Sequence, residues 1–179
     1  MTEEPLFAAP ARFAGAVKKG LERERLRKLT EADMLSLLTE RYSKEYGNGG
    51  RYVVARHVRS HAGFEAKRTA DFVAMDTWPS SRFAIHGHEV KVSRSDWLHE
   101  LKQPEKAAEF VPYMDYWWLV VSDAAIVRED ELPDGWGLMA VRGGKLVAVR
   151  QAPRRKPLPL TETRIAAFVR AVAKTAGAA

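Results

Sequence analysis

The sequence contains no cysteine, which excludes disulfide bonds, thiolate metal ligands and cysteine nucleophiles. It also has no apolar run near the roughly 18 residues that a membrane-spanning helix needs. The N-terminus, MTEEPLFAAP, begins acidic and lacks the long apolar stretch of a secretory signal. We therefore expect a cytoplasmic protein that does not associate with a membrane.

The composition is that of an ordinary globular chain with an excess of cations. Hydrophobic residues make up 46% and charged residues 29% of the 179 residues, which suits one domain with its own core. The formal charge is +6 and the pI is about 9.6. A basic surface concentrates polyanions, nucleic acid first among them, although many basic proteins of this size bind nothing acidic.

The chain is expected to divide into a leading segment and one domain. Residues 1–28 predict a loose tail and then a basic helix, in which lysine and arginine outnumber glutamate. This helix face is compatible with a stripe that contacts DNA phosphates and equally with an ordinary solvated face. Residues 29–179 predict a single domain.

Apolar spacing predicts the order of elements in this domain. A helix capped by Thr30 is followed by three strands, a helix that begins near Ser95, a fourth strand, a hairpin and a closing helix. The strands are expected at RYVVARHV, TADFVAMDT, RFAIHGHEVKVS and YWWLVVS, and the hairpin at GLMAVRGGKLVAVRQA. This αβββαβ order with an added C-terminal hairpin and helix predicts an α/β fold, a mixed sheet flanked by helices.

Periodicity also predicts which large side chains are buried. We expect Trp117 and Trp118 in the core, and Trp78 and Trp97 at the surface. The inward face of the closing helix is expected to carry Ile165, Phe168, Val169 and Val172.

The stretch HGHEVKVS, residues 86–93, places charge on one face of a predicted strand. Strand alternation turns Val90 and Val92 to a core and puts Glu89 and Lys91 together on the other face. A buried carboxylate needs a cation nearby, which Lys91 alone would supply. Taken alone, the pair is compatible with a surface ion pair that contributes little.

A second acid changes this interpretation. Asp71 begins the preceding strand, and if the two strands pair through the Trp78-Pro79 turn, Asp71 lies beside Glu89. Two carboxylates that close repel each other unless a divalent cation lies between them. Oxygen ligands suit Mg²⁺ or Mn²⁺, which would activate a phosphate and a water molecule. Lys91 would then stabilise charge on the phosphate.

The Asp…Glu-x-Lys layout on a hairpin after a helix resembles the active site of the PD-(D/E)xK nuclease superfamily, although Ala70 stands where the name-giving proline would be. The stretches RTADFVAMDTW, HEVKVSRSDWLHELK, EKAAEFVPYMDYWWLVV and DGWGLMAVRGGKLVAVRQAPRRKP are similar to those of the MmcB-like DNA repair proteins, a branch of that superfamily. The resemblance covers roughly residues 35–172. It implies a restriction-endonuclease-like core, with Asp71, Glu89 and the carbonyl of Val90 as metal ligands and Lys91 as the catalytic lysine.

The resemblance also implies a second set of residues. Many superfamily members add an acid from the first helix, for which Glu40 is the candidate. From this set, DNA contacts are expected at Arg68, Ser93, Lys106 and Tyr113. Arg56 and Lys67 are expected to contact the DNA backbone if the cations that precede Asp71 line one cleft, and to be scattered surface cations otherwise. The MmcB-like proteins usually show KSS after the acid, where this chain has KVSRSD. Asp115 belongs to the same set but is expected to form a structural pair.

Two histidines on the third strand, His86 and His88, raise the alternative of a zinc site. No third nitrogen or sulfur ligand is evident near them in the sequence, so we expect no zinc. The sequence therefore predicts a nuclease that hydrolyses DNA with Mg²⁺ or Mn²⁺, in DNA repair or in phage or bacterial DNA processing. The alternatives are a non-catalytic nucleic-acid-binding module on the same fold and a structural protein whose acids only pair with Lys91. The oligomeric state stays open, and a homodimer is one option.

Overall fold

The computed structural model describes residues 28–43, 50–62 and 68–178. Residues 1–27, which include nearly all of the predicted basic helix, lie outside this part, as does Lys67. The elements are α2 (Glu31–Tyr42), β1 (Tyr52–Arg59), β2 (Thr69–Asp76), β3 (Ile85–Lys91), α3 (Arg94–Leu101), α4 (Glu105–Ala108), β4 (Tyr116–Val121), β5 (Gly137–Arg142), β6 (Lys145–Arg150) and α5 (Glu162–Ala176). Short 3₁₀ turns occur at Pro79–Ser81, Val111–Tyr113 and Ala124–Ile126.

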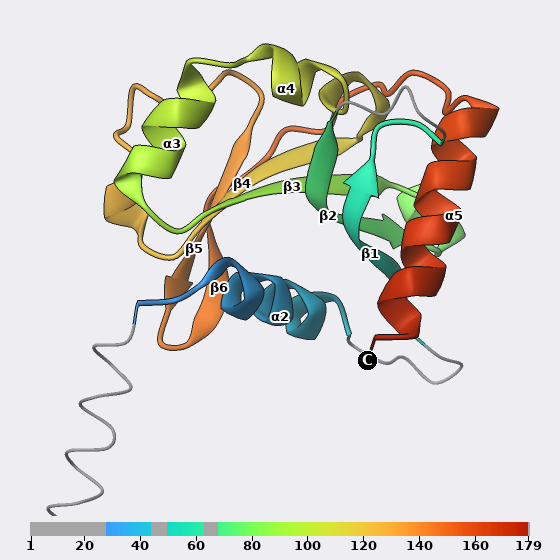
Figure 1. The fold of residues 1–179 in the computed structure, drawn as a ribbon, viewed down its shortest axis with the longest axis horizontal. Coiled ribbons are helices and arrows are strands. Elements are labelled where there is room, and N and C mark those ends of the chain that lie inside the picture. Colours follow the sequence, from blue (N-terminus) through green and yellow to red (C-terminus); the bar gives the residue numbers. More distant parts are fainter. Residues whose placement is uncertain (1–27, 44–49, 63–67, 179) are drawn as a thin grey trace, which may run out of the picture.

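The six described strands form one mixed sheet in the order β1-β2-β3-β4-β5-β6. The first three strands are an antiparallel meander, β4 and β5 run parallel to β3, and β6 returns antiparallel to β5. Helix α2 lies on one side of this sheet, while α3 and α4 lie on the other and α5 packs along β1 (Figure 1). The predicted mixed sheet flanked by helices is therefore confirmed.

Strand alternation divides the core into two layers, one on each side of the sheet. On the α2 side, Met34, Leu35 and Leu38 pack against Phe72 and Val90. The layer on the other side includes Val73, Trp97, Trp117, Leu119 and Val121. Trp118 belongs to the α2 layer, so both central tryptophans are buried as predicted.

Local sequence signals fix the ends of several elements. Thr30 and Asp33 form a reciprocal capping box at the start of α2. The β5–β6 hairpin turns on Gly143 and Gly144, whose φ angles of 57° and 76° suit glycine. These two predictions from sequence are confirmed.

Two predictions about exposure are wrong. Trp97 is 1% exposed because α3 turns it onto the sheet. On α5, Ile165 and Val169 are 47% and 57% exposed, since the helix turns Ala167 and Ala171 toward the sheet instead. In the described part of the chain, no helix is both long and apolar enough to cross a bilayer.

Candidate functional site

Strands β2 and β3 pair from Met75 opposite Ile85 to Phe72 opposite His88, and the ladder stops there. The next residue of β2 is Asp71. Its carboxylate oxygen Oδ2 accepts a hydrogen bond from the backbone N–H of Val90 at 2.8 Å. The aspartate side chain thus takes the place of a backbone carbonyl in the ladder. We call this point, where β2 and β3 diverge beside Asp71 and Val90, the β2–β3 fork.

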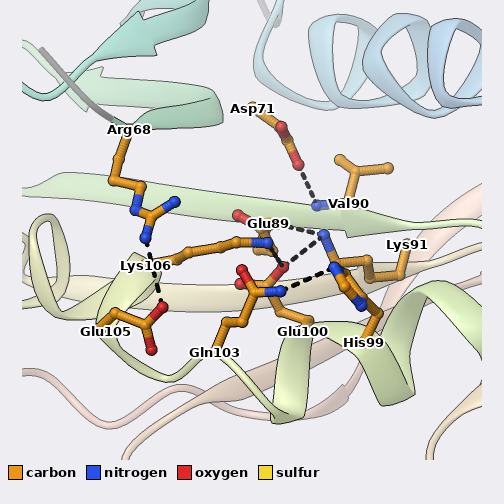
Figure 2. Close-up of polar contacts among 10 residues, drawn as sticks. All are labelled: Arg68, Asp71, Glu89, Val90, Lys91, His99, Glu100, Gln103, Glu105 and Lys106. Atoms are coloured by element: carbon orange, nitrogen blue, oxygen red, sulfur yellow. Dashed lines mark hydrogen bonds and ion pairs between the residues drawn. The ribbon is translucent and has the colours of Figure 1, made fainter.

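Glu89 and Lys91 form an ion pair on β3 beside this fork. The Lys91 ammonium also lies 3.1 Å from Oε2 of Glu100, which α3 brings in. Since Val90 packs into the α2 layer, alternation places Glu89 and Lys91 on the opposite face, toward α3. Figure 2 shows Asp71 reaching β3 from the other side of the strand.

The electrostatics show that these groups influence one another. Burial and the charge of Asp71 raise the pKa of Glu89 to about 8. Burial also raises the pKa of Asp71, against the hydrogen bond from Val90 and the charge of Lys91. For Lys91, burial alone would lower the pKa, but the charges of Glu89, Glu100 and Asp71 outweigh it and raise the pKa. The lysine is therefore a cation, while burial and the charge of Asp71 disfavour the ionised form of Glu89.

A cavity of about 270 Å³ adjoins this ion pair, lined by Arg68, Thr69, Glu89, Lys91, Glu100 and Lys106. Lys106 lies 3.6 Å from Glu100, and Arg68 lies 3.4 Å from Glu105 (Figure 2). The structure therefore brings Arg68 and Lys106 to the same place as Lys91. Glu89 and Glu100 line the same cavity and pair with these lysines, so the cations are partly neutralised where a phosphate group would enter.

A second group meets Asp71 from the α2 side. The ligand atoms of Glu31, His57 and Asp71 all lie within 4.8 Å of one another. Glu31 begins α2, and His57 lies on β1 between the pairs Arg56–Phe72 and Val58–Ala70. The first-helix acid near Asp71 is thus Glu31.

Glu40 lies elsewhere. It is exposed near the other end of α2 and lines a separate cavity of about 490 Å³ together with Arg41, His86 and Lys145. It is not part of the group around Asp71 in the described residues. The structure thus gives no support to Glu40 as a metal ligand.

The other three described candidates for DNA contact also have partners within the protein. Arg56 donates from Nη2 to the Thr39 hydroxyl at 2.8 Å and so ties β1 to α2. Ser93 caps α3 and accepts from the Asp96 N–H. The Arg164 guanidinium lies over the Tyr113 ring, 3.8 Å from the ring centroid, in a cation–π contact.

Each of these contacts accounts for its residue without DNA. Asp115 is a structural residue as expected, since it accepts from the Arg154 guanidinium and from the Ile85 N–H.

His88 lies in the core, and His86 is half-buried at the edge of the cavity lined by Glu40. His88 is fully buried and hydrogen bonds the Tyr42 hydroxyl at 2.9 Å and the Phe72 carbonyl at 3.2 Å. His86 stacks on Tyr116, with ring centroids 4.6 Å apart. Burial lowers the pKa of His86 to about 4 and of His88 to about 3, so both are neutral at physiological pH.

Sequence reasoning missed three residues of this region: Glu31, His57 and Glu100. Glu100 had a readable signal, because positions 97, 100 and 101 share one face of a helix that starts at residue 94. No comparable spacing marks Glu31 or His57.

No protein-family model matches the sequence, and the search of curated proteins gives no match. Among solved structures, the chain is similar to SPO1766, a protein of unknown function from Silicibacter pomeroyi. The TM-score is 0.55 at 20% identity, over 85% of this chain and 90% of that chain. At this identity the similarity shows a shared fold and nothing about activity.

Proposed function

We propose that the protein is a divalent-metal-dependent deoxyribonuclease with a restriction-endonuclease-like core. The observation that carries the proposal is the fork between β2 and β3. There Asp71 hydrogen bonds the Val90 N–H, and Glu89 and Lys91 follow on the same strand. The order of one helix, an antiparallel meander and a parallel fourth strand supports the same core.

The residues at the fork fit a divalent cation. Carboxylate oxygens are the ligands that Mg²⁺ and Mn²⁺ accept. Asp71 uses Oδ2 for the Val90 N–H, and a carboxylate has further lone pairs for a cation. Glu89 is held by Lys91, so sharing an ion with Asp71 requires its side chain to turn away from Lys91. The Val90 carbonyl stays a predicted third ligand.

Each protein group then has a defined task in hydrolysis. A bound Mg²⁺ or Mn²⁺ would polarise the phosphoryl oxygen and acidify a water molecule. Lys91 donates to a non-bridging phosphate oxygen and stabilises the charge that develops there. Arg68 and Lys106 line the adjoining cavity and hold the DNA backbone.

Glu100 keeps Lys91 charged and directed toward the cavity. In the reaction, a bond forms between the water oxygen and phosphorus, and one P–O bond to a sugar breaks. One proton of the water ends on the released hydroxyl, and the other leaves the product phosphate.

The test is cleavage of labelled single-stranded, duplex and branched DNA with Mn²⁺ or Mg²⁺, and with EDTA as the metal-free control. We expect cleavage that stops with EDTA and is absent in Asp71→Ala. Lys91→Ala should slow cleavage by about 10²–10³-fold. An Asp71→Ala protein that cuts DNA as fast as wild type would contradict the assignment.

One observation favours the non-catalytic alternative. Lys91 is already paired with two carboxylates, Glu89 and Glu100, as a structural lysine would be. Binding of DNA in a gel-shift assay without cleavage, over the same DNA panel and several metals, would support a binding module instead.

A further inference from the structure

We propose that Glu31, His57 and Asp71 bind one divalent transition-metal ion, with the imidazole of His57 as a ligand. This inference deepens the proposed nuclease function and rests on it for the role of the ion in hydrolysis. The binding of the ion can be measured without any reaction. The proposed site has Glu31 in place of Glu40 as the acid from α2, and it adds His57 as a nitrogen ligand.

The first argument is convergence. The three residues come from α2, β1 and β2, and their ligand atoms lie within 4.8 Å of one another (the span one ion can bridge). Two carboxylates at this separation repel each other, and a divalent cation between them removes that cost.

The second argument is the backbone of His57. Its φ is 52°, in the left-handed region that non-glycine residues seldom occupy. This conformation breaks the alternation of β1, so that Ala55 and Val58 both face the layer opposite α2. His57 then turns with Arg56 toward α2, which is where Glu31 lies.

The third argument is the state of Glu89. This acid is paired with Lys91 on the α3 side of β3, so it is not placed to share an ion with Asp71 without moving. Glu31 and His57 already lie beside Asp71. Three protein ligands leave open positions for water and a phosphate oxygen, which an ion that acts in hydrolysis needs.

The ligand types indicate which ion binds. A mixed set of two carboxylates and one imidazole favours first-row transition metals, whereas Mg²⁺ prefers all-oxygen sites. We therefore expect the folded chain to bind Mn²⁺ more tightly than Mg²⁺, and this preference should depend on His57.

The experiment is a titration of the full chain with Mn²⁺, in which the electron paramagnetic resonance signal of free Mn²⁺ is the readout. Competition by Mg²⁺ is a second readout. His57→Gly removes the imidazole and accepts the positive φ without strain. Glu31→Gln removes one carboxylate, and Glu40→Gln on the same helix is its matched control. His99→Ala is the control for loss of a histidine, and Glu89→Gln tests the other ligand set. Circular dichroism of each variant checks that it is folded.

We expect His57→Gly and Glu31→Gln each to weaken Mn²⁺ binding by at least roughly 10–100-fold. Loss of a residue that only hydrogen bonds to a metal ligand already costs this much in affinity. Glu40→Gln and His99→Ala should bind as wild type does, and His57→Gly should lose most of the preference for Mn²⁺ over Mg²⁺.

Wild-type Mn²⁺ affinity in folded His57→Gly and Glu31→Gln would overturn this inference. If Glu89→Gln alone then lost binding, the ion would be shared by Asp71 and Glu89 and the nuclease proposal would stand. Wild-type protein that binds no Mn²⁺ at millimolar concentration would also overturn the inference. The DNA-cleavage assay with Mg²⁺ tests the nuclease proposal separately.

Discussion

Gly87→Ala tests the packing that aligns β3, the strand of Glu89 and Lys91, with β4. Gly87 pairs with Trp117 across the two strands. A Cβ atom at Gly87 would overlap two ring carbons of Trp117 and lie 3.2 Å from Cγ of Met114. Trp117 is fully buried and packs against the rings of Phe110 and Trp136, so its ring has no space to turn away.

The expected magnitude follows from this overlap. Inserting one methyl group into a well-packed core typically costs about 1–3 kcal/mol. Because the added carbon meets ring atoms of a fixed tryptophan, we expect the upper half of that range. For a chain of this length, each kcal/mol corresponds to roughly 2–4 °C in Tm. Gly87→Ala should therefore lower Tm by about 4–12 °C.

Thermal unfolding measures the shift in Tm, and urea unfolding measures the change in free energy, each monitored by tryptophan fluorescence and by circular dichroism. Gly177→Ala is the control, since a Cβ there meets the Ala173 and Lys174 carbonyls at ordinary distances of 3.5 and 4.0 Å. If the free energy of unfolding of Gly87→Ala matched that of the control, the Trp117 ring would be able to move away from the added methyl group. The close approach of β3 and β4 would then have another cause.

The remaining predictions concern stability in acid, the pairing of Glu100 with Lys91 and Lys106, and the N-terminal cap of α2. Burial lowers the pKa of His86 to about 4 in the folded protein, whereas in the unfolded chain it stays near 6.5. As the pH falls from 6.5 toward 4, only the unfolded chain binds the proton, so the free energy of unfolding decreases. His86→Phe should reduce the loss between pH 7 and pH 5 by about 2 kcal/mol in urea unfolding, and an unchanged slope would contradict this. Glu100→Gln should lower the free energy of unfolding in urea by roughly 1.5–3 kcal/mol, because Lys91 and Lys106 lose a charged partner, and under the proposed nuclease function it should reduce kcat for DNA cleavage more than it changes KM. Thr30→Ala should cost about 1 kcal/mol of unfolding free energy, since the capping box between Thr30 and Asp33 is lost, and a neutral result would show that packing alone fixes this end of α2.

The order of elements was predictable because each boundary has a local chemical cause. The capping box at Thr30 and the glycine pair at 143–144 depend on neighbours within a few residues. The pairing of β2 with β3 follows from two alternating runs joined by a short turn. Such signals do not depend on how the distant elements pack.

The choice between Glu31 and Glu40 depends on packing and not on pattern. The two acids are nine residues apart on α2, which is about 14 Å along the helix axis. The apolar positions show which face of the helix is buried, but they do not show which end lies over the β2–β3 fork. The sequence therefore predicted an acid from this helix and named Glu40, whereas the structure brings Glu31 close to Asp71.

His57 and Trp97 show two different reasons for a missed residue. The left-handed φ of His57 has no sequence signature, because it belongs to a histidine and not to a glycine. Trp97 did have a signature, since a helix capped by Ser93 puts residues 97, 100 and 101 on one face. Applying that spacing would have placed both Trp97 and Glu100 inside.

Asp71 connects the parts of the candidate site because of where it lies and how short it is. Its side chain fills a position in the ladder between β2 and β3, which a glutamate would overshoot by one methylene. Where the two strands separate, the sheet no longer divides its two faces completely. Groups from α2, such as Glu31, and groups from the α3 side, such as Lys91, then act on the same carboxylate, as the causes of its pKa shift show. The chemistry of this region therefore depends on the fork itself, and residues far apart in the sequence are brought together by the divergence of two strands.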